Sequence, residues 1–201
     1  MWTCFRERQY LSEVQRIRWM WTEFYRVPGP WPGSLAIGPR PRGGDWLGDE
    51  LGRWRASGVT DVVSLLTPPE VQELELQGEA AMCAQRGLAF HSLPIPDRAV
   101  PRSGPAFDLL LDSLLEALAA GRSVLVHCRQ GIGRASLVAT SLLIRVGTHP
   151  ELALESVARA RLRSIPDTEE QRDWLRARVA MPAPSAGVHR GHRGDLRPGG
   201  T

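Results

Sequence analysis

Near the middle of the chain, a cysteine, two glycines and an arginine stand within one short run. The run lies between a strand-like and a helix-like segment and reads His127-Cys128-Arg129-Gln130-Gly131-Ile132-Gly133-Arg134. A cysteine attacks an electrophile only as its thiolate, yet with an ordinary pKa of about 8.5 it is mostly protonated at neutral pH. If Cys128 is a nucleophile, its surroundings must lower that pKa.

The residues that follow Cys128 are suited to holding an anion. Gly131 and Gly133 allow the backbone to turn tightly, so that several N–H groups point at one centre. The loop would also wrap over the N-terminus of the next helix, whose unpaired N–H groups and dipole favour negative charge. Arg134 adds a planar fork that can pair with two phosphoryl oxygens. We therefore expect Cys128 to attack a phosphate ester and to form a cysteinyl-phosphate intermediate.

The departing alcohol or phenolate needs a proton, so a carboxylic acid should be able to reach the same site. Asp97 is the candidate, because it follows a predicted strand, upstream of Cys128, in the run Leu93-Pro94-Ile95-Pro96-Asp97-Arg98. The alternative interpretation is a turn residue that follows Pro96. We expect Asp97 to act as the general acid.

The pattern His127-Cys128-x-x-Gly131-x-x-Arg134 resembles the signature loop of the cysteine-based protein tyrosine phosphatase superfamily, and its core is most similar to the dual-specificity branch. The resemblance extends to residues 62–66, 94–98 and 123–146, and so covers most of residues 34–180. It implies a phosphatase without metal or cofactor, in which Asp97 later acts as the base that activates water. The residues that bind the substrate phosphate would be Arg129, Gln130, Gly131, Ile132 and Gly133.

One position inside the signature departs from the superfamily. After the arginine, the superfamily usually has Ser or Thr, whose hydroxyl helps the thiolate to leave, whereas this chain has Ala135 and then Ser136. One residue rotates a helical side chain by about 100°, so Ser136 need not reach the sulfur of Cys128. We expect the breakdown of the intermediate to be slow, while its formation survives.

Other residues are expected to support the site. His127 is interpreted as a buried scaffold residue that hydrogen-bonds the loop, because the mechanism already has its acid. Gln171 matches a glutamine that positions the hydrolytic water in parts of the superfamily, although a helix cap is the stronger interpretation. Oxidation could link Cys83 to Cys128, as in some relatives, although a packed helix cysteine is the plainer interpretation of Cys83.

Strand-like and helix-like segments alternate from Ser34 onward. Apolar and β-branched runs predict strands over residues 35–37, 59–66, 88–95 and 123–127. Periodic runs predict helices over residues 45–57, 68–86, 104–120 and 134–146. Two more helices are expected after Thr148 and after Thr168, the second with a capping box to Gln171. This order predicts an α/β fold with a central, largely parallel sheet of four to five strands flanked by helices, as in the protein tyrosine phosphatases.

The phosphatase domain is expected over residues 27–180. Residues 1–26 form a basic, aromatic-rich extension. Three interpretations of this extension remain open. It could be a helix packed on the domain, or a helix that serves a partner, self-association or a membrane surface. Alternatively, translation starts at Met20. Residues 181–201 combine Pro, Gly, Ser and Arg without periodicity, which predicts a disordered tail.

Composition excludes several classes of protein. The formal charge is +3 and is carried by the two ends, so the near-neutral central part argues against a nucleic-acid partner. No apolar run approaches the roughly 18–20 residues of a membrane helix, and the N-terminus carries charges where a signal peptide is apolar. Three cysteines without a CxxC pair favour neither a disulfide framework nor a zinc site. We expect a cytoplasmic protein without membrane insertion.

Phosphotyrosine in proteins, and also phosphoserine and phosphothreonine, are the first expected substrates. A phosphatase of phosphoinositides or other small molecules is the second choice, because the loop holds no Lys for a polyphosphorylated headgroup. Sulfur transfer and arsenate reduction also use a cysteine in an anion-binding loop, but neither needs a general acid at Asp97. A catalytically weak phospho-binding module stays open because of Ala135.

Overall fold

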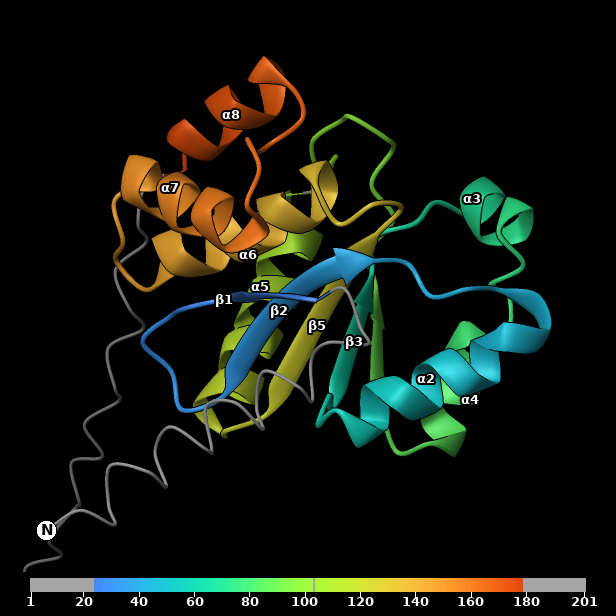
Figure 1. Cartoon of the computed structure of the whole chain (residues 1–201). Coiled ribbons are helices and arrows are strands. Elements are labelled where there is room, and N and C mark those ends of the chain that lie inside the picture. The colour runs from blue at the N-terminus through green and yellow to red at the C-terminus, as the bar shows by residue number, and fades with distance from the viewer. Residues whose placement is uncertain (1–23, 103, 179–201) are drawn as a thin grey trace, which may run out of the picture.

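A five-stranded sheet forms the centre of the protein, with the strand order β1-β2-β5-β3-β4 (Figure 1). The computed structural model describes residues 24–102 and 104–178. The strands are β1 (Tyr25–Val27), β2 (Ser34–Pro39), β3 (Asp61–Ser64), β4 (Ala89–Ser92) and β5 (Ser123–Cys128). β1 pairs with β2 in antiparallel fashion, and the other neighbouring strands are parallel. The predicted α/β fold with a largely parallel sheet is confirmed.

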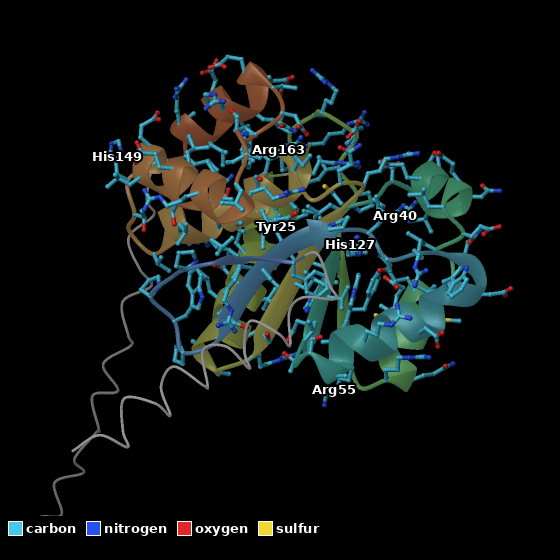
Figure 2. All side chains as sticks on the ribbon, in the orientation of Figure 1. Tyr25, Arg40, Arg55, His127, His149 and Arg163 are labelled. Carbon is cyan, nitrogen blue, oxygen red and sulfur yellow. The ribbon has the colours of Figure 1, made fainter. Side chains whose placement is uncertain are left out.

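Helices cover both faces of the sheet, and side chains fill the space on each side of it (Figures 1 and 2). One face carries α5 (Gly104–Ala119), α6 (Gly133–Arg145), α7 (Pro150–Arg161) and α8 (Glu169–Arg176). The other face carries α2 (Leu47–Ala56), which follows the 3-10 turn η1 (Gly44–Trp46), and α4 (Glu79–Gln85). The short helix α3 (Pro68–Glu73) lies beyond the end of β3.

The sheet divides the buried apolar side chains into two clusters. Successive residues of a strand point to opposite faces, so Val63 and Val126 join the cluster under α5 and α6, whereas Val62 and Leu125 join the one under α2 and α4. Every residue of α6 from Gly133 to Ile144 is buried, which explains the apolar character of this segment on nearly every side. α6 is therefore the central helix of the larger cluster.

The carboxyl ends of the parallel strands meet at one edge of the sheet. Pro39 of β2 lies opposite Cys128 of β5, and Ser64 of β3 lies opposite both His127 and Ser92. Ligands of open α/β sheets bind outside the carboxyl ends of the strands. The fold thus places Cys128 at the edge where a site is expected.

The single helix predicted over residues 68–86 is wrong. The structure has α3 and α4 instead, and the chain between them includes Glu75 in the left-handed region at φ 54°. The carbonyl oxygen of Glu75 accepts a hydrogen bond from the Gly44 N–H at 3.0 Å, and that of Leu74 would lie 1.9 Å from a Cβ on Gly43. The chain between the two helices thus contacts a segment distant in sequence, and α4 begins after Gly78, which is its N-cap.

The other elements follow the prediction more closely. Helices were expected over 104–120 and 134–146 and after Thr168, and α5, α6 and α8 lie there. Thr168 caps α8 by accepting the Gln171 N–H at 3.2 Å, but the Gln171 side chain turns elsewhere, so the capping box is half formed. The boundary expected between residues 26 and 27 falls inside β1, which was not predicted. Residues 1–23 and 179–201, on which the remaining expectations for the two ends fall, lie outside the described residues.

Candidate active site

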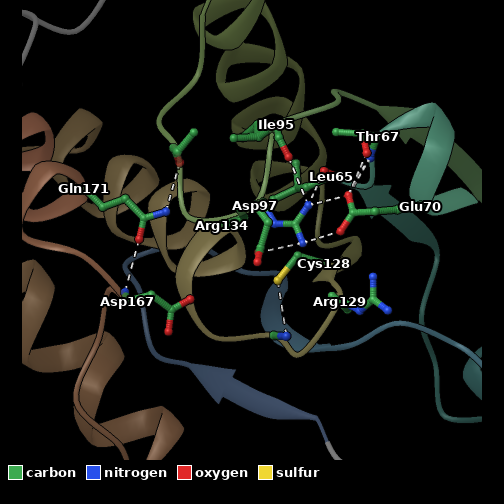
Figure 3. Close-up of polar contacts among 12 residues, drawn as sticks. Leu65, Thr67, Glu70, Ile95, Asp97, Cys128, Arg129, Arg134, Asp167 and Gln171 are labelled. Carbon is green, nitrogen blue, oxygen red and sulfur yellow. Dashed lines mark hydrogen bonds and ion pairs between the residues drawn. The ribbon is translucent and has the colours of Figure 1, made fainter.

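The loop after β5 curls back over Cys128. The Gly131 N–H donates a hydrogen bond to Cys128 Sγ at 3.3 Å, and the cysteine is buried (Figure 3). Gly131 has φ 66°, and a Cβ there would lie 2.3 Å from the carbonyl carbon of Gly38 in β2. Both the backbone conformation and the close approach of β2 therefore require glycine at position 131.

Gly133 is needed for a different reason. It opens α6 with ordinary helical backbone, but a Cβ there would lie 2.1 Å from Asp167 Oδ2. Asp167 comes from the chain between α7 and α8. The second glycine of the loop therefore makes room for a carboxylate rather than for a turn.

Arg134 lies in the first turn of α6 with 1% of its side chain exposed. Its two terminal nitrogens bind the two carboxylate oxygens of Glu70 at 2.7 and 2.8 Å, and Nη1 also donates to the Ile95 carbonyl at 3.0 Å. Burial lowers the pKa of Arg134, but the hydrogen bond to Glu70 and the charges of Cys128, Glu70 and Asp97 outweigh it and raise the pKa above its usual value. Arg134 is therefore a fixed, permanently charged fork beside Cys128.

Glu70 is a residue of the site that the sequence did not reveal as such. It forms a capping box with Thr67 at the start of α3, accepting the Thr67 N–H at 2.9 Å, while the same carboxylate holds Arg134. Burial raises the pKa of Glu70, but the hydrogen bonds from Arg134 and Thr67 lower it further, to about 2. The Thr-x-x-Glu spacing signals a helix start, and nothing in it points to Arg134.

Asp97 lies beside the same fork. Its Oδ1 is 3.1 Å from Arg134 Nη2, and 61% of its side chain is exposed. The structure thus brings Asp97, Cys128 and Arg134 to one cavity of about 180 Å³. The full lining is Asp97, Arg98, Cys128, Arg129, Gln130, Ile132, Gly133, Arg134 and Asp167.

Known proteins share the fold of this chain. Residues 31–187 match the family described as "PTP-SAK: Swiss Army Knife protein, DSP-PTPase phosphatase domain". The chain belongs to this family of phosphatase domains. The superfamily and the dual-specificity branch expected from the signature loop are thereby confirmed.

Relatives of the phosphatase domain include cyclin-dependent kinase inhibitor 3. The protein from Rattus norvegicus is 29% identical over 123 residues, which cover 60% of this chain and 58% of the relative. The Homo sapiens protein is 27% identical over 123 residues, with the same two shares. The chain thus spans less than two thirds of the length of these curated relatives.

Solved structures share the fold of the phosphatase domain. A kinase associated phosphatase with its catalytic-site cysteine changed to serine has a TM-score of 0.69 at 20% identity, covering 77% of this chain and 92% of that one. The active form of Tk-PTP has a TM-score of 0.62 at 26% identity, covering 80% of this chain and 100% of that one.

A basic side chain from a distant helix of the phosphatase domain holds the loop from outside. Arg161, at the end of α7, donates through Nε to the Gly131 carbonyl at 2.9 Å and through Nη2 to the Gln130 carbonyl at 3.3 Å. Its guanidinium lies 3.8 Å from the centre of the Tyr25 ring, which belongs to β1. Because these carbonyl oxygens are bound on the outside, the N–H groups of the loop can face Cys128. Sequence reasoning did not find this clamp.

Arg129 and Gln130 both line the cavity of the phosphatase domain, but the Arg129 side chain is committed elsewhere. Its guanidinium binds both oxygens of Glu73 at 3.1 and 2.5 Å. The hydrogen bonds and charge of Glu73 raise the pKa of Arg129. The Arg129 side chain is therefore already paired before a substrate binds, and its backbone N–H is left for the phosphate.

His127 does not hydrogen-bond the loop through its side chain, contrary to expectation. It is fully buried on the face of the sheet opposite to Cys128, because neighbouring strand residues alternate. Its ring lies 5.8 Å from that of Trp54, and its Nε2 lies 2.9 Å from Glu79 Oε1, out of line for a hydrogen bond. The interpretation as a buried scaffold residue agrees with this position.

The side chains of Ser136 and Gln171 are both bound elsewhere, so neither is placed to act on the Cys128 sulfur or on a water molecule. The Ser136 hydroxyl donates to the Ile132 carbonyl one helical turn earlier. Gln171 is fully buried, its Oε1 accepts the Asp167 N–H at 3.1 Å, and its Nε2 donates to the Ala99 carbonyl at 2.9 Å. The side-chain amide thus joins two loops, at Asp167 and at Ala99, and both of its ends are occupied.

The described residues contain no helix long and apolar enough to cross a bilayer. They also contain no group of three or more His, Cys, Asp or Glu side chains able to hold a metal ion.

Proposed function

We propose that this protein is a cysteine-dependent phosphatase that hydrolyses phosphomonoesters in proteins, first of all phosphotyrosine, and phosphoserine and phosphothreonine as well. The observation that carries the proposal is the cavity lined by Cys128 and the Arg134 fork, with the loop folded over it so that the Gly131 N–H donates to Cys128 Sγ. Membership of the DSP-PTPase phosphatase domain family supports the same reaction. The catalytic set is Cys128, Arg134 and Asp97.

In the first step, Cys128 attacks phosphorus as a thiolate while the ester oxygen leaves. The phosphoryl oxygens bind the loop N–H groups and Arg134. Before substrate binds, Nη2 of Arg134 lies 3.1 Å from Oδ1 of Asp97. A phosphate dianion competes with Asp97 for this nitrogen, so substrate binding frees the carboxyl group for the leaving oxygen. Protonated Asp97 then gives its proton to that oxygen, and a cysteinyl phosphate remains.

The charges around the cavity favour a single phosphate on a protein over a polyphosphorylated headgroup. Asp167 adds a negative charge to the lining, and Arg129 is already paired with Glu73. A second phosphate on the substrate would be repelled by Asp167 and would compete with Glu73.

Location and partners belong to the same proposal. A phosphoprotein substrate is consistent with the cytoplasmic location expected from the composition. Self-association or partner binding through residues 1–26 stays a prediction, because residues 1–23 lie outside the described residues.

The test is phosphate release from phosphotyrosine, phosphoserine and phosphothreonine peptides, phosphoinositides and nucleotide 5′-phosphates, each with and without a chelator. We expect the phosphotyrosine peptide to be the best substrate and the chelator to have no effect. Loss of activity with the chelator would contradict the metal-free mechanism. Faster release from phosphoinositides than from peptides would contradict the substrate class.

A phospho-binding module with weak catalysis is the second candidate, favoured by one observation. Ala135 supplies no hydroxyl, and the Ser136 hydroxyl is bound to the Ile132 carbonyl. Equal turnover by wild type and Cys128→Ser, together with tight binding of the phosphopeptide by both, would favour this module over the enzyme.

A further inference from the structure

A second carboxylate lines the same cavity as Cys128, and the mechanism above leaves it without a role. Asp167 lies in the chain between α7 and α8, and its Oδ2 sits against the first residue of α6, where a Cβ on Gly133 would be 2.1 Å away. Figure 3 shows it on the Gln171 side of the loop, apart from Arg134. Within the described residues, the Asp167 side chain forms no hydrogen bond or ion pair.

Asp167 is held in place through its backbone. Its N–H donates to Oε1 of the buried Gln171 at 3.1 Å, and Nε2 of Gln171 donates to the Ala99 carbonyl at 2.9 Å. The Thr168 hydroxyl, next in the chain, donates to the Arg98 carbonyl at 3.4 Å. The two loops that carry Asp97 and Asp167 are thus tied to each other. Gln171 is a positioning residue in this arrangement, and the carboxylate of Asp167 stays free.

An unpaired carboxylate beside a phosphate site is unfavourable unless a donor stands between the two anions. The bound phosphomonoester offers no such donor at its phosphoryl oxygens. After the first step, however, the leaving group departs and water takes its place above the phosphorus. Water is a donor that one carboxylate oxygen can orient, so the charge of Asp167 becomes favourable in the second step.

We propose that Asp167 is the base of the second step, in place of Asp97, to which the resemblance assigns this role; the inference rests on the proposed phosphatase function. Water attacks the phosphorus of the cysteinyl phosphate, and one of its protons passes to the Asp167 carboxylate. The P–S bond breaks, and its electron pair returns to Cys128 as the thiolate. Inorganic phosphate leaves, and Asp167 then releases its proton to solvent, while Asp97 regains one for the next cycle.

Two features of the site favour this division of labour. Asp97 lies 3.1 Å from Arg134 Nη2 before substrate binds, so once it has lost its proton its charge is drawn back to the guanidinium rather than to the attacking water. Ala135 and Ser136 leave the second step without the hydroxyl that would help the thiolate to depart. A dedicated base over the first turn of α6 compensates for that missing hydroxyl, because it activates the attacking water.

Rapid-mixing kinetics of Asp167→Asn with p-nitrophenyl phosphate test this assignment, because its phenolate leaves without needing a proton. We expect a burst of one phenolate per active site, followed by steady turnover about 100-fold slower than wild type, the scale of a lost general base. Acid quenching during turnover should recover phosphate on Cys128. Asp167→Glu should restore part of the steady rate.

Asp49→Asn, an exposed aspartate on α2 across the sheet, serves as the matched control and should behave as wild type. Asp167→Asn keeps the backbone N–H that Gln171 binds, so its melting temperature should match wild type. Unchanged turnover without a burst would overturn the inference, as would a raised KM without accumulated phosphocysteine, which would make Asp167 a substrate contact. A wild type that turns over without any phosphocysteine would instead overturn the proposed function itself.

Discussion

Arg134 and its carboxylate partners decide the chemistry at the scale of single residues. Both carboxylate oxygens of Glu70 bind the guanidinium, and Asp97 forms an ion pair with the same group. The signature loop predicted Cys128 and Arg134, and the run around Asp97 predicted a carboxyl group nearby. Glu70, Asp167 and Arg161 could not be predicted, because each reaches the loop from a segment distant in sequence.

The Glu70–Arg134 ion pair makes the free energy of unfolding depend on pH in the acid range. The folded pKa of Glu70 is about 2, below the ordinary 4.5, so its contribution is fully present above pH 4.5 and is lost as the pH falls toward 2. Urea unfolding across this window should show wild type losing stability more steeply than Glu70→Gln. Equal slopes would show that the pair does not favour the folded state. Glu116→Gln, at an exposed position of α5 that forms no ion pair within the described residues, is the control variant and should keep the wild-type slope.

Gly131 should tolerate no side chain. Gly131→Ala places a methyl group 2.3 Å from the Gly38 backbone at φ 66°, so we expect the loop to shift and kcat/KM to fall by about 100-fold or more. Gly121→Ala is the matched control, with φ 78° but nothing within 4 Å. It should cost about 1–2 kcal/mol of stability and leave kcat/KM unchanged. Similar activity in the two variants would contradict the packing argument.

At the scale of elements, α7 reaches the loop through Arg161, and β1 contacts that side chain through Tyr25. Neither element is near Cys128 in sequence, and the topology alone brings them there. The sequence predicted most helices because their apolar spacing and caps are local signals. It missed β1, a three-residue strand that pairs with β2, and it merged α3 with α4, between which the chain contacts Gly43 and Gly44.

The Arg161 clamp predicts an effect on phosphate affinity. In Arg161→Gln the Gln130 and Gly131 carbonyls lose their donors, so the loop N–H groups should be less well aligned. We expect kcat/KM to fall by about tenfold and inhibition by inorganic phosphate to weaken by a similar factor. Arg159→Gln, at an exposed position of the same helix, should change neither quantity. A loss of stability without weaker phosphate inhibition would make Arg161 a purely structural residue.

At the scale of the whole molecule, the sheet separates the two cysteines that the described residues contain. Cys128 belongs to the cluster under α6, and Cys83 belongs to the cluster under α2 and α4. Burial, with the charge of Glu79, raises the pKa of the Cys83 thiol to about 12. This arrangement favours the interpretation of Cys83 as a packed helix residue.

Mild peroxide should therefore oxidise Cys128 without linking it to Cys83. We expect peptide mass spectrometry to find sulfenic and higher oxides on Cys128, and Cys83→Ser to give the same products at the same rate. A disulfide between Cys83 and Cys128 in the folded protein would show that the sheet does not keep them apart.

Trapping of phosphate on Cys128 tests the central claim most directly. Acid quenching during turnover of a phosphotyrosine peptide should yield the peptide that contains Cys128 with one phosphate attached. Asp97→Asn should form this species slowly from the phosphopeptide and at nearly the wild-type rate from p-nitrophenyl phosphate, because only the first leaving group needs the proton. Phosphate release without any phosphocysteine, or undiminished turnover by Cys128→Ser, would contradict the account.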